Sequence, residues 1–333
     1  MQKFSIILPV RNGGNYLKAC INSILSQTFV DFNLIVLDNA STDGSLEWVQ
    51  SINDARIMIY PSSESLSIEK NWARIVEVPK NEFMTCIGHD DIFLPGYLEE
   101  MNRLILQYPD ASLYQTHFSY INADGEIIRS CLPSAELQYP KDFLGHILSN
   151  SIDVNGTGFM TRSRDFERIG GIPAYPNLLF ADFVLWMELT RINYLATSPK
   201  NCFSYRLHQS MTTTSTDEKF QSAFELFVNY LYSLKQADPK LNDVIQNDAG
   251  TILVFYCKSF SHRLLRTKIK LRENLTVKVW ANKCDQFANL LIENNKLNPS
   301  SSFSVQLAQA IDSTALTRTL FLTFKKIYSK PIL

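Results

Sequence analysis

Short apolar segments alternate with segments of helical periodicity along the first hundred residues. Phe4–Val10, Phe32–Leu37 and Phe83–Ile87 are nearly continuous apolar runs, typical of strands buried on both faces of a parallel sheet, and Arg56–Tyr60 reads as a shorter strand. The segments between them place apolar residues three or four positions apart, as amphipathic helices do. This alternation predicts an α/β fold with an open, mostly parallel sheet and helices on both faces.

Each of these strands is followed by a short segment that contains polar residues. The segments are Pro9–Asn12, Asp38–Ser41, Pro61–Ser63 and His89–Asp91. Because such sheets bind ligands at the carboxyl ends of their strands, we expect these residues to meet at one edge. Asp90 and Asp91 are oxygen ligands of the kind that Mg²⁺ and Mn²⁺ prefer. The alternative is that the two aspartates only cap the helix that starts near Leu94.

The two common phosphate-binding motifs are absent from the sequence. The first turn has no GxGxxG, and GxxxxGK[ST] occurs nowhere. A nucleotide at this edge therefore needs a cation to neutralise its phosphates, with Asp90 and Asp91 as the ligands. Asp38, at the end of the neighbouring strand, is able to accept a hydrogen bond from a pyrimidine N3–H, or it serves only as a turn or cap residue.

Charge is distributed unevenly along the chain. The formal net charge is −1 over 333 residues, yet the segment after residue 250 has 13 Lys and Arg against four acidic residues. The densest basic run is Arg263–Arg272, within a region of helical periodicity that ends with a helix over Leu316–Tyr328. We interpret the run as a possible docking surface for an anionic membrane rather than for nucleic acid. The alternative is a solvated basic face on a helical bundle.

Three features of the sequence predict a cytoplasmic protein, which would be peripheral on the inner membrane face if the basic run docks there. The first ten residues lack the apolar core and cleavage site of a secretory signal. No apolar run is long enough to span a bilayer. The six cysteines are scattered without a CxxC pair, which indicates reduced thiols rather than disulfides or a zinc site.

Several segments of the first hundred residues closely resemble family 2 glycosyltransferases, which have the GT-A fold. The resemblance covers the opening SIILPVRNGGNYL, the end of the helix near Ser23–Thr28, the segment LDNASTDGS, Ser67–Trp72, and GHDD followed by LPGYL, in the family's order. It implies an inverting transfer of a sugar from a nucleotide diphosphate-sugar, usually linked to UDP or dTDP.

The resemblance also implies roles for individual residues on the donor side. Pro9 and Arg11 would lie along the nucleoside, and Asp38 would contact the pyrimidine base. Lys70 stands where relatives often carry an arginine near the donor, and it would act as a point charge.

The aspartate pair has its own implied roles. Asp90 would face the ribose or sugar, and Asp91 would ligate Mn²⁺ or Mg²⁺. His89 stands where many relatives have another aspartate, so the metal site would depend chiefly on Asp91.

The acceptor side is expected in residues 106–216. The segment NGTGFMTRSRDFERIGGI also resembles the family, and its glycines would let the backbone approach the transferred sugar. Asp182 occupies the place of the family's general base. The alternative is that Asp182 is the N-cap of a helix over 183–192. Ala181 stands where the family has a neighbouring acid. Arg206 and His208 lie in a segment that resembles the family's mobile loop and would reach the diphosphate or metal.

These features together predict a metal-dependent, inverting glycosyltransferase. It would use a saccharide or lipid-linked saccharide acceptor in surface polysaccharide biosynthesis. The expected regions are a nucleotide-sugar-binding half over 1–105, an acceptor-binding half over 106–216, and a helical, basic region over 217–333. One alternative is a nucleotide-sugar-binding protein without catalysis, in which Ala181 marks a decayed site. Another is a sugar nucleotidyltransferase. Such an enzyme would normally carry a loop rich in glycine and in Lys or Arg after the first strand, and the segment VRNGGNYLK at this place fits that description poorly.

Overall fold

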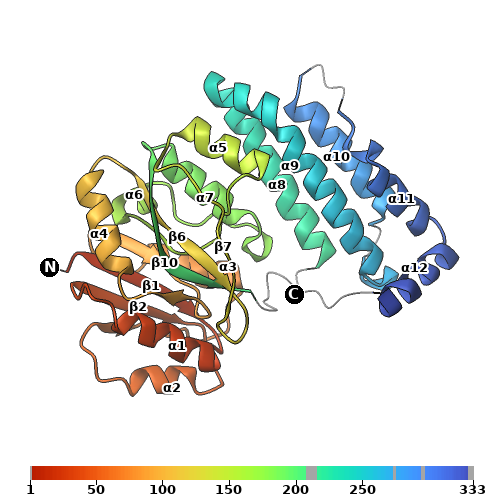
Figure 1. Ribbon diagram of the computed structural model, residues 1–333. Helices are drawn as coiled ribbons and strands as arrows, with labels where there is room; N and C mark the ends of the chain where they lie inside the picture. The colour runs from red at the N-terminus through yellow and green to blue at the C-terminus, as the bar shows by residue number, and fades with distance from the viewer. Residues whose placement is uncertain (1, 208–215, 273–274, 294–296, 329–333) are drawn as a thin grey trace. The chain divides into compact units, whose positions relative to one another are not determined.

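The structure is a computed structural model that describes residues 2–207, 216–272, 275–293 and 297–328. Its internal contacts divide the described chain into two compact units. The first contains residues 2–143 and 152–207, and the second contains Leu144–Ser151 and the described residues after 213. Each unit is described by itself below (Figure 1).

The first half of unit 1 alternates strands and helices as the apolar pattern predicts. Its elements are β1 (Phe4–Val10), α1 (Gly14–Leu25), β2 (Phe32–Asp38), α2 (Ser45–Gln50), β3 (Ile57–Ile59), α3 (Ile68–Ala73), a 3₁₀ turn over Arg74–Val76, and β4 (Phe83–Cys86). The strands lie side by side in the order β3-β2-β1-β4 and all run parallel. The predicted parallel sheet is therefore confirmed, and its strands end at one edge.

The second half of unit 1 extends the same sheet with mixed strand directions. The elements are β5 (Ile92–Phe93), α4 (Tyr97–Gln107), β6 (Leu113–Ile121), β7 (Ile127–Ser130), β8 (Leu137–Gln138), β9 (Phe159–Arg162), α6 (Ser163–Arg168), a 3₁₀ turn over Pro176–Leu178, α7 (Ala181–Thr190) and β10 (Leu195–Arg206). Between β8 and β9, α5 (Pro140–Ser149) begins in unit 1, and its residues from Leu144 on belong to unit 2. β9 lies antiparallel between β4 and β6, and β10 runs parallel to β6. This arrangement brings the ends of β4, β6 and β10 to the ligand-binding edge.

Two adjacent turns at this edge are tied together by side chains. The backbone N–H of Asn12 donates to Ser41 Oγ (3.0 Å), and Asn12 Oδ1 accepts from the backbone N–H of Thr42 (2.8 Å). Neither Ser41 nor Thr42 caps the next helix, because α2 begins later and its N-cap is Gly44, with φ of 85°. Ser41 instead joins the turn after β2 to the turn after β1.

Unit 2 is helical around an aromatic core, as the periodicity predicts. Its helices are α8 (Asp217–Ala237), α9 (Pro239–Arg266), α10 (Val277–Leu291), α11 (Phe303–Asp312) and α12 (Ala315–Tyr328), with 3₁₀ turns η3 (Ile269–Leu271) and η4 (Pro299–Ser301). Phe220 stacks on Phe260 at 4.4 Å between ring centroids, and Trp280 packs edge-on against Phe260 at 4.7 Å. Among the described helices of the whole chain, none combines the length and the apolar character that a membrane span requires.

Candidate active site

Asp91 is the buried centre of the ligand-binding edge. Its side chain is 2% exposed, Oδ1 accepts a hydrogen bond from the backbone N–H of Arg206 (3.0 Å), and Oδ2 accepts one from the hydroxyl of Thr157 (2.8 Å). These partners come from the end of β10 and from the segment before β9. One carboxylate therefore joins three segments that are far apart in the sequence.

Burial and a like charge act together on this carboxyl group. Burial raises the pKa of Asp91 well above its usual range, and the neighbouring Asp90 raises it further, while the hydrogen bonds from Arg206 and Thr157 lower it. The ionised pair is thus unfavourable in the absence of a positive charge. A cation at this position would relieve that repulsion.

Gly88 allows the two carboxylates to fold back over the strand end. A Cβ atom at this position would lie 2.6 Å from Asp90 Oδ1, closer than Cβ atoms approach other atoms, and 3.1 Å from Asp91 Oδ2, so at least Asp90 would have to move. The glycine that interrupts the apolar run is therefore required by the close approach of these side chains.

Arg206 fastens the strand end beneath this pair. Its buried guanidinium donates from Nε to the carbonyl of Asp90 (2.8 Å) and from Nη1 to the carbonyls of Asn122 (2.9 Å) and Ala123 (3.0 Å). Its Cζ also lies 4.7 Å from the ring centroid of Tyr16. In this structure the side chain links the end of β4 to the β6–β7 hairpin, and its predicted contact with the diphosphate remains a prediction. His208 lies outside the described residues.

Asp38 lies buried at the end of β2. Its Oδ2 accepts a hydrogen bond from the backbone N–H of Ser41 (3.2 Å), so Asp38 is a turn residue, as one of the two alternatives had it. This contact does not exclude the other alternative, a hydrogen bond to a pyrimidine. Its carbonyl accepts from Ser62 N–H (2.8 Å) and from Arg74 Nη1 (2.9 Å). Asp38 is therefore held rigidly where the nucleoside is expected.

Arg74 is a residue of this edge that the sequence analysis missed. Its guanidinium donates to the carbonyls of Asp38 and Tyr60 (2.5 Å) and to Asn71 Oδ1 (2.9 Å). Burial lowers its pKa. Arg74 thus holds together the ends of β2 and β3, and nothing in a single sequence distinguishes it from a surface arginine.

The other predicted donor-side residues differ in exposure. Pro9 is buried within β1, where it pairs in register with Leu37. Arg11 is exposed directly after β1. Lys70 is exposed on α3, and its backbone N–H donates to the capping hydroxyl of Ser67 (3.3 Å).

Asp182 lies in the first turn of α7. The helix begins at Ala181 with Phe180 as N-cap, so the reading of Asp182 as N-cap of a 183–192 helix is wrong; its Oδ1 accepts instead from the backbone N–H of Phe183 (3.0 Å). Surrounding protein atoms desolvate the carboxyl and raise its pKa to about 6, against the opposing effect of that hydrogen bond. A carboxyl with this pKa is able to accept a proton near neutral pH.

The backbone before α7 is strained. Asn177, Leu178 and Phe180 have φ of 52°, 57° and 64°, which is unfavourable by roughly 1–3 kcal/mol for each non-glycine residue. The backbone N–H of Asn177 donates to the carboxylate of Glu69 on α3 (2.6 Å), which anchors the turn. The strained turn therefore delivers Asp182 to a defined position.

Tyr205 connects Asp182 with the aspartate pair, and the sequence analysis did not select it. Its phenol is desolvated, and the charges of Asp91, Asp90 and Asp182 all raise its pKa further. The charges of all three carboxylates therefore act on this one phenol. Contacts of the segment before β9 agree with this: Thr157 donates to Asp91 (2.8 Å), and a Cβ on Gly156 would lie 3.9 Å from Asp182 Cβ, so the predicted base lies close to the predicted metal ligands.

The segment before β9 lies between these groups. Gly156 is close to Asp182, because a Cβ on Gly156 would lie 3.9 Å from Asp182 Cβ. At Gly158, with φ of 76°, a Cβ would lie 2.8 Å from the ring of Phe203. Gly158 is thus required by its packing against Phe203. The sequence analysis expected the glycines of this segment only to let the backbone approach a sugar.

The sequence of the chain matches a known protein family. Residues 5–170, about half of the chain, match the family described as "Glycosyl transferase family 2". The chain belongs to this family. It is therefore a glycosyltransferase.

The relatives of this glycosyltransferase are bacterial and distant. An uncharacterized glycosyltransferase of Rickettsia typhi is 24% identical over 80% of this chain and 85% of its own length. The Escherichia coli protein named UDP-Glc:alpha-D-GlcNAc-diphosphoundecaprenol beta-1,3-glucosyltransferase WfgD is 22% identical over 68% of this chain and 86% of its own length.

A solved structure resembles the chain over nearly its whole length. The crystal structure of Staphylococcus aureus TarS residues 1–349, in complex with UDP-GlcNAc, has a TM-score of 0.69 with 16% sequence identity, covering 99% of this chain and 94% of that chain. At this identity the likeness concerns the fold alone. The predicted GT-A fold with a C-terminal helical region is confirmed.

Replacing Gly88 by alanine tests the spacing of the aspartate pair. We expect Gly88→Ala to lower turnover by about 10- to 100-fold, because the new methyl group must displace Asp90 and Asp91 by a fraction of an ångström or more. Turnover and the thermal unfolding midpoint would be measured together.

Gly96→Ala is the matched control, since a Cβ there meets no atom within 4 Å and it also lies in the turn before α4. Full turnover in Gly88→Ala would contradict the role of the pair.

Proposed function

We propose that this glycosyltransferase transfers a sugar, with inversion, from a UDP- or dTDP-linked donor to a saccharide or lipid-linked saccharide in surface polysaccharide biosynthesis. The observation that carries the proposal is that Thr157 donates to Asp91 (2.8 Å) while a Cβ on the adjacent Gly156 would lie 3.9 Å from Asp182 Cβ, so the candidate base lies close to the aspartate pair. The donor class is supported by the UDP-GlcNAc complex of the similar TarS structure and by the name of WfgD, and the name of WfgD also supports the acceptor class.

The aspartate pair fits a hard divalent cation, Mn²⁺ or Mg²⁺. Each oxygen of Asp91 accepts one hydrogen bond and so retains a lone pair, while Asp90 is the more exposed of the two. Among the described residues no group of three or more His, Cys, Asp or Glu side chains forms, which suits an ion that completes its shell with phosphate and water oxygens. A bound cation would supply positive charge that stabilises the departing diphosphate.

The residues of the adjacent strand ends would bind the donor. We assign Asp38 to the base, Pro9 and Arg11 to the nucleoside, and Lys70 with Arg206 to the phosphates or sugar. Exposed Arg11 and Lys70 have side chains that are able to move toward an anion, whereas Arg206 would act mainly by holding Asp90 in place.

Asp182 would act as the general base. It would take the proton from an acceptor hydroxyl, whose oxygen would then form a bond to the anomeric carbon on the face opposite the diphosphate. The bond from that carbon to the diphosphate oxygen would break, and the nucleoside diphosphate would leave with the electron pair. Burial gives Asp182 a pKa of about 6, so the group is ionised at neutral pH and is still basic.

Charge-removing variants of the pair test the cation site. Asp90→Asn and Asp91→Asn should each abolish the part of the thermal stabilisation by UDP or a UDP-sugar that depends on Mn²⁺. Asp91→Asn should not lower the unfolding midpoint of the protein alone at pH 8, because it removes a buried charge that Asp90 repels, and the hydroxyl of Thr157 is able to accept a hydrogen bond from the new amide.

Asp31→Asn removes one acidic charge from just before β2, at the other end of the strand from Asp38, and serves as the control. Undiminished Mn²⁺-dependent binding in both pair variants would disprove the site.

A conservative change tests the base. Asp182→Asn keeps the size of the side chain and an oxygen for the N–H of Phe183, yet it cannot take a proton. We expect turnover to fall by roughly 10²–10⁴-fold while donor affinity changes little. Normal turnover by folded Asp182→Asn would contradict the assignment.

The raised pKa of Asp182 predicts two opposite pH dependences. The ratio kcat/KM should rise as the pH increases through about 6, when the base ionises, and this rise should be absent from the residual activity of Asp182→Asn. Because the folded-state pKa lies above the unfolded value, ionisation of Asp182 lowers the free energy of unfolding as the pH rises toward 6. Asp182→Asn should therefore unfold at a higher temperature than the parent at pH 8 but not at pH 4.

A further inference from the structure

Helix α12 presents an apolar face to solvent. Leu316, Leu320 and Phe324 are 70%, 62% and 56% exposed. Because they are four residues apart, they lie along one side of the helix. In an ordinary surface helix such a stripe faces the protein core.

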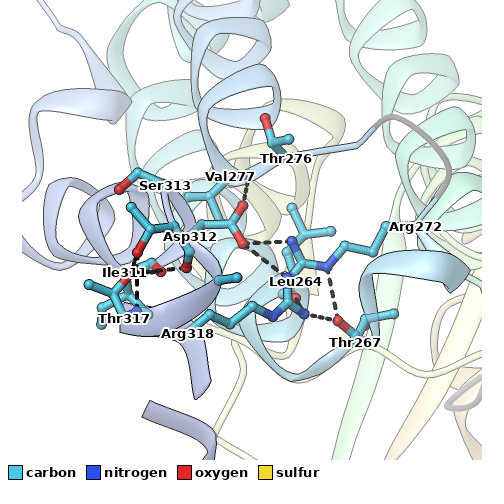
Figure 2. Close-up of polar contacts among 12 residues, drawn as sticks. Leu264, Thr267, Arg272, Thr276, Val277, Ile311, Asp312, Ser313, Thr317 and Arg318 are labelled. Atoms are coloured by element: carbon cyan, nitrogen blue, oxygen red, sulfur yellow. Dashed lines mark hydrogen bonds and ion pairs between the residues drawn. The ribbon is translucent and has the colours of Figure 1, made fainter. Parts of the chain in front are cut away.

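A buried charge on the opposite side explains this orientation. Arg318 lies about 200° around the helix from Leu316, at about 100° per residue. Its guanidinium is buried and donates to Asp312 Oδ1 (3.1 Å), to the carbonyl of Leu264 (3.4 Å) and to the carbonyl of Thr267 (Figure 2). Turning the apolar stripe inward would expose these contacts and leave Asp312 without one of its cationic partners.

The same carboxylate fixes the turn that follows α9. Asp312 Oδ1 also accepts from Nη1 of buried Arg272 (2.8 Å), and its Oδ2 accepts from the backbone N–H of Val277 (2.9 Å). Nε of Arg272 donates to the carbonyl of Thr267 (3.0 Å), as Figure 2 shows. Arg272, Asp312 and Arg318, here called the Asp312 cluster, therefore hold α12 and the turn η3 together.

The turn η3 adds exposed apolar and basic side chains. Ile269 and Leu271 are each 61% exposed, and Arg266 and Lys268 directly before them are exposed as well. Arg266 and Lys325 of α12 both lie close enough to His262 for their charges to lower its pKa, along with its burial. Basic groups from α9 and α12 thus lie near one another.

The charge of this region is of one sign. Residues 249–272 contain six Lys and Arg and no acidic residue, and residues 313–333 contain four and again no acidic residue. Arg263 and Arg272 of the basic run form ion pairs with Asp217 and Asp312, both at 2.8 Å, so the run does not act as one free patch. Among the described residues of the run, Arg266 and Lys268 are exposed near Ile269.

We propose that the α12 surface, formed by Leu316, Leu320 and Phe324 together with Ile269 and Leu271, docks on an anionic lipid bilayer. Apolar side chains of this kind enter the boundary between headgroups and acyl chains, and nearby Lys and Arg residues attract anionic headgroups. A second copy of the chain is the less suitable occupant. A symmetric pair would place the same basic surface on both sides of the interface, where like charges repel.

Vesicle flotation with the full chain tests the apolar part. The chain should float with vesicles of phosphatidylglycerol and phosphatidylcholine, and the double variant Leu320→Ser with Phe324→Ser should bind them about tenfold or more weakly. Both side chains are exposed, so the thermal unfolding midpoint should not fall. Leu226→Ser, which changes a 42% exposed leucine on α8, is the matched control and should bind like the parent.

A second double variant, Arg266→Glu with Lys268→Glu, tests the contribution of the basic side chains. This double variant should also lose flotation with the anionic vesicles, and added salt should weaken binding by the parent chain. Undiminished flotation of either double variant would overturn the proposal. So would equal binding to pure phosphatidylcholine vesicles, or a concentration-dependent dimer that the Leu320→Ser, Phe324→Ser variant abolishes. No nucleotide or sugar takes part, so these outcomes are independent of the proposed catalysis.

Discussion

The burial of one carboxylate, Asp91, organises the catalytic unit. A buried carboxylate is stable only when hydrogen bonds or opposite charges compensate for its lost hydration. Here Thr157 and the backbone of Arg206 provide the hydrogen bonds, which forces the segment before β9 and the end of β10 to meet the end of β4. Asp90 adds a like charge beside it, and a bound cation would relieve the repulsion between the two.

Arginines hold the surrounding turns by their donors rather than by ion pairs. Arg74 binds the carbonyls of Asp38 and Tyr60, and Arg206 binds those of Asp90 and of the β6–β7 turn. Five of the six non-glycine residues with positive φ in the described chain lie in turns of this edge, namely Asn12, Ala40, Asn177, Leu178 and Phe180. Strain of this kind persists only where neighbouring contacts enforce it, which is typical of binding and catalytic sites.

Much of the fold and part of the site follow from the sequence alone. The apolar runs Phe4–Val10 and Phe32–Leu37 predict β1 and β2 closely, because strands buried on both faces leave a continuous local signal. The carboxyl-end rule then places Asp38, Asp90 and Asp91 at one edge without reference to any distant contact. The family resemblance adds Asp182, whose role still requires the experiments described above.

Only the tertiary structure shows which side chains contact one another. Tyr205, Thr157 and Arg74 carry no local signal, because their importance arises from groups far away in the chain, such as Asp91 for Thr157 (66 positions) and Asp38 for Arg74 (36 positions). The pKa of Asp182 depends on how many protein atoms surround it, and the local sequence does not show this. The face of α12 that points outward is likewise decided by Asp312 and Arg272, since helical periodicity predicts the stripe but not the buried arginine that opposes it.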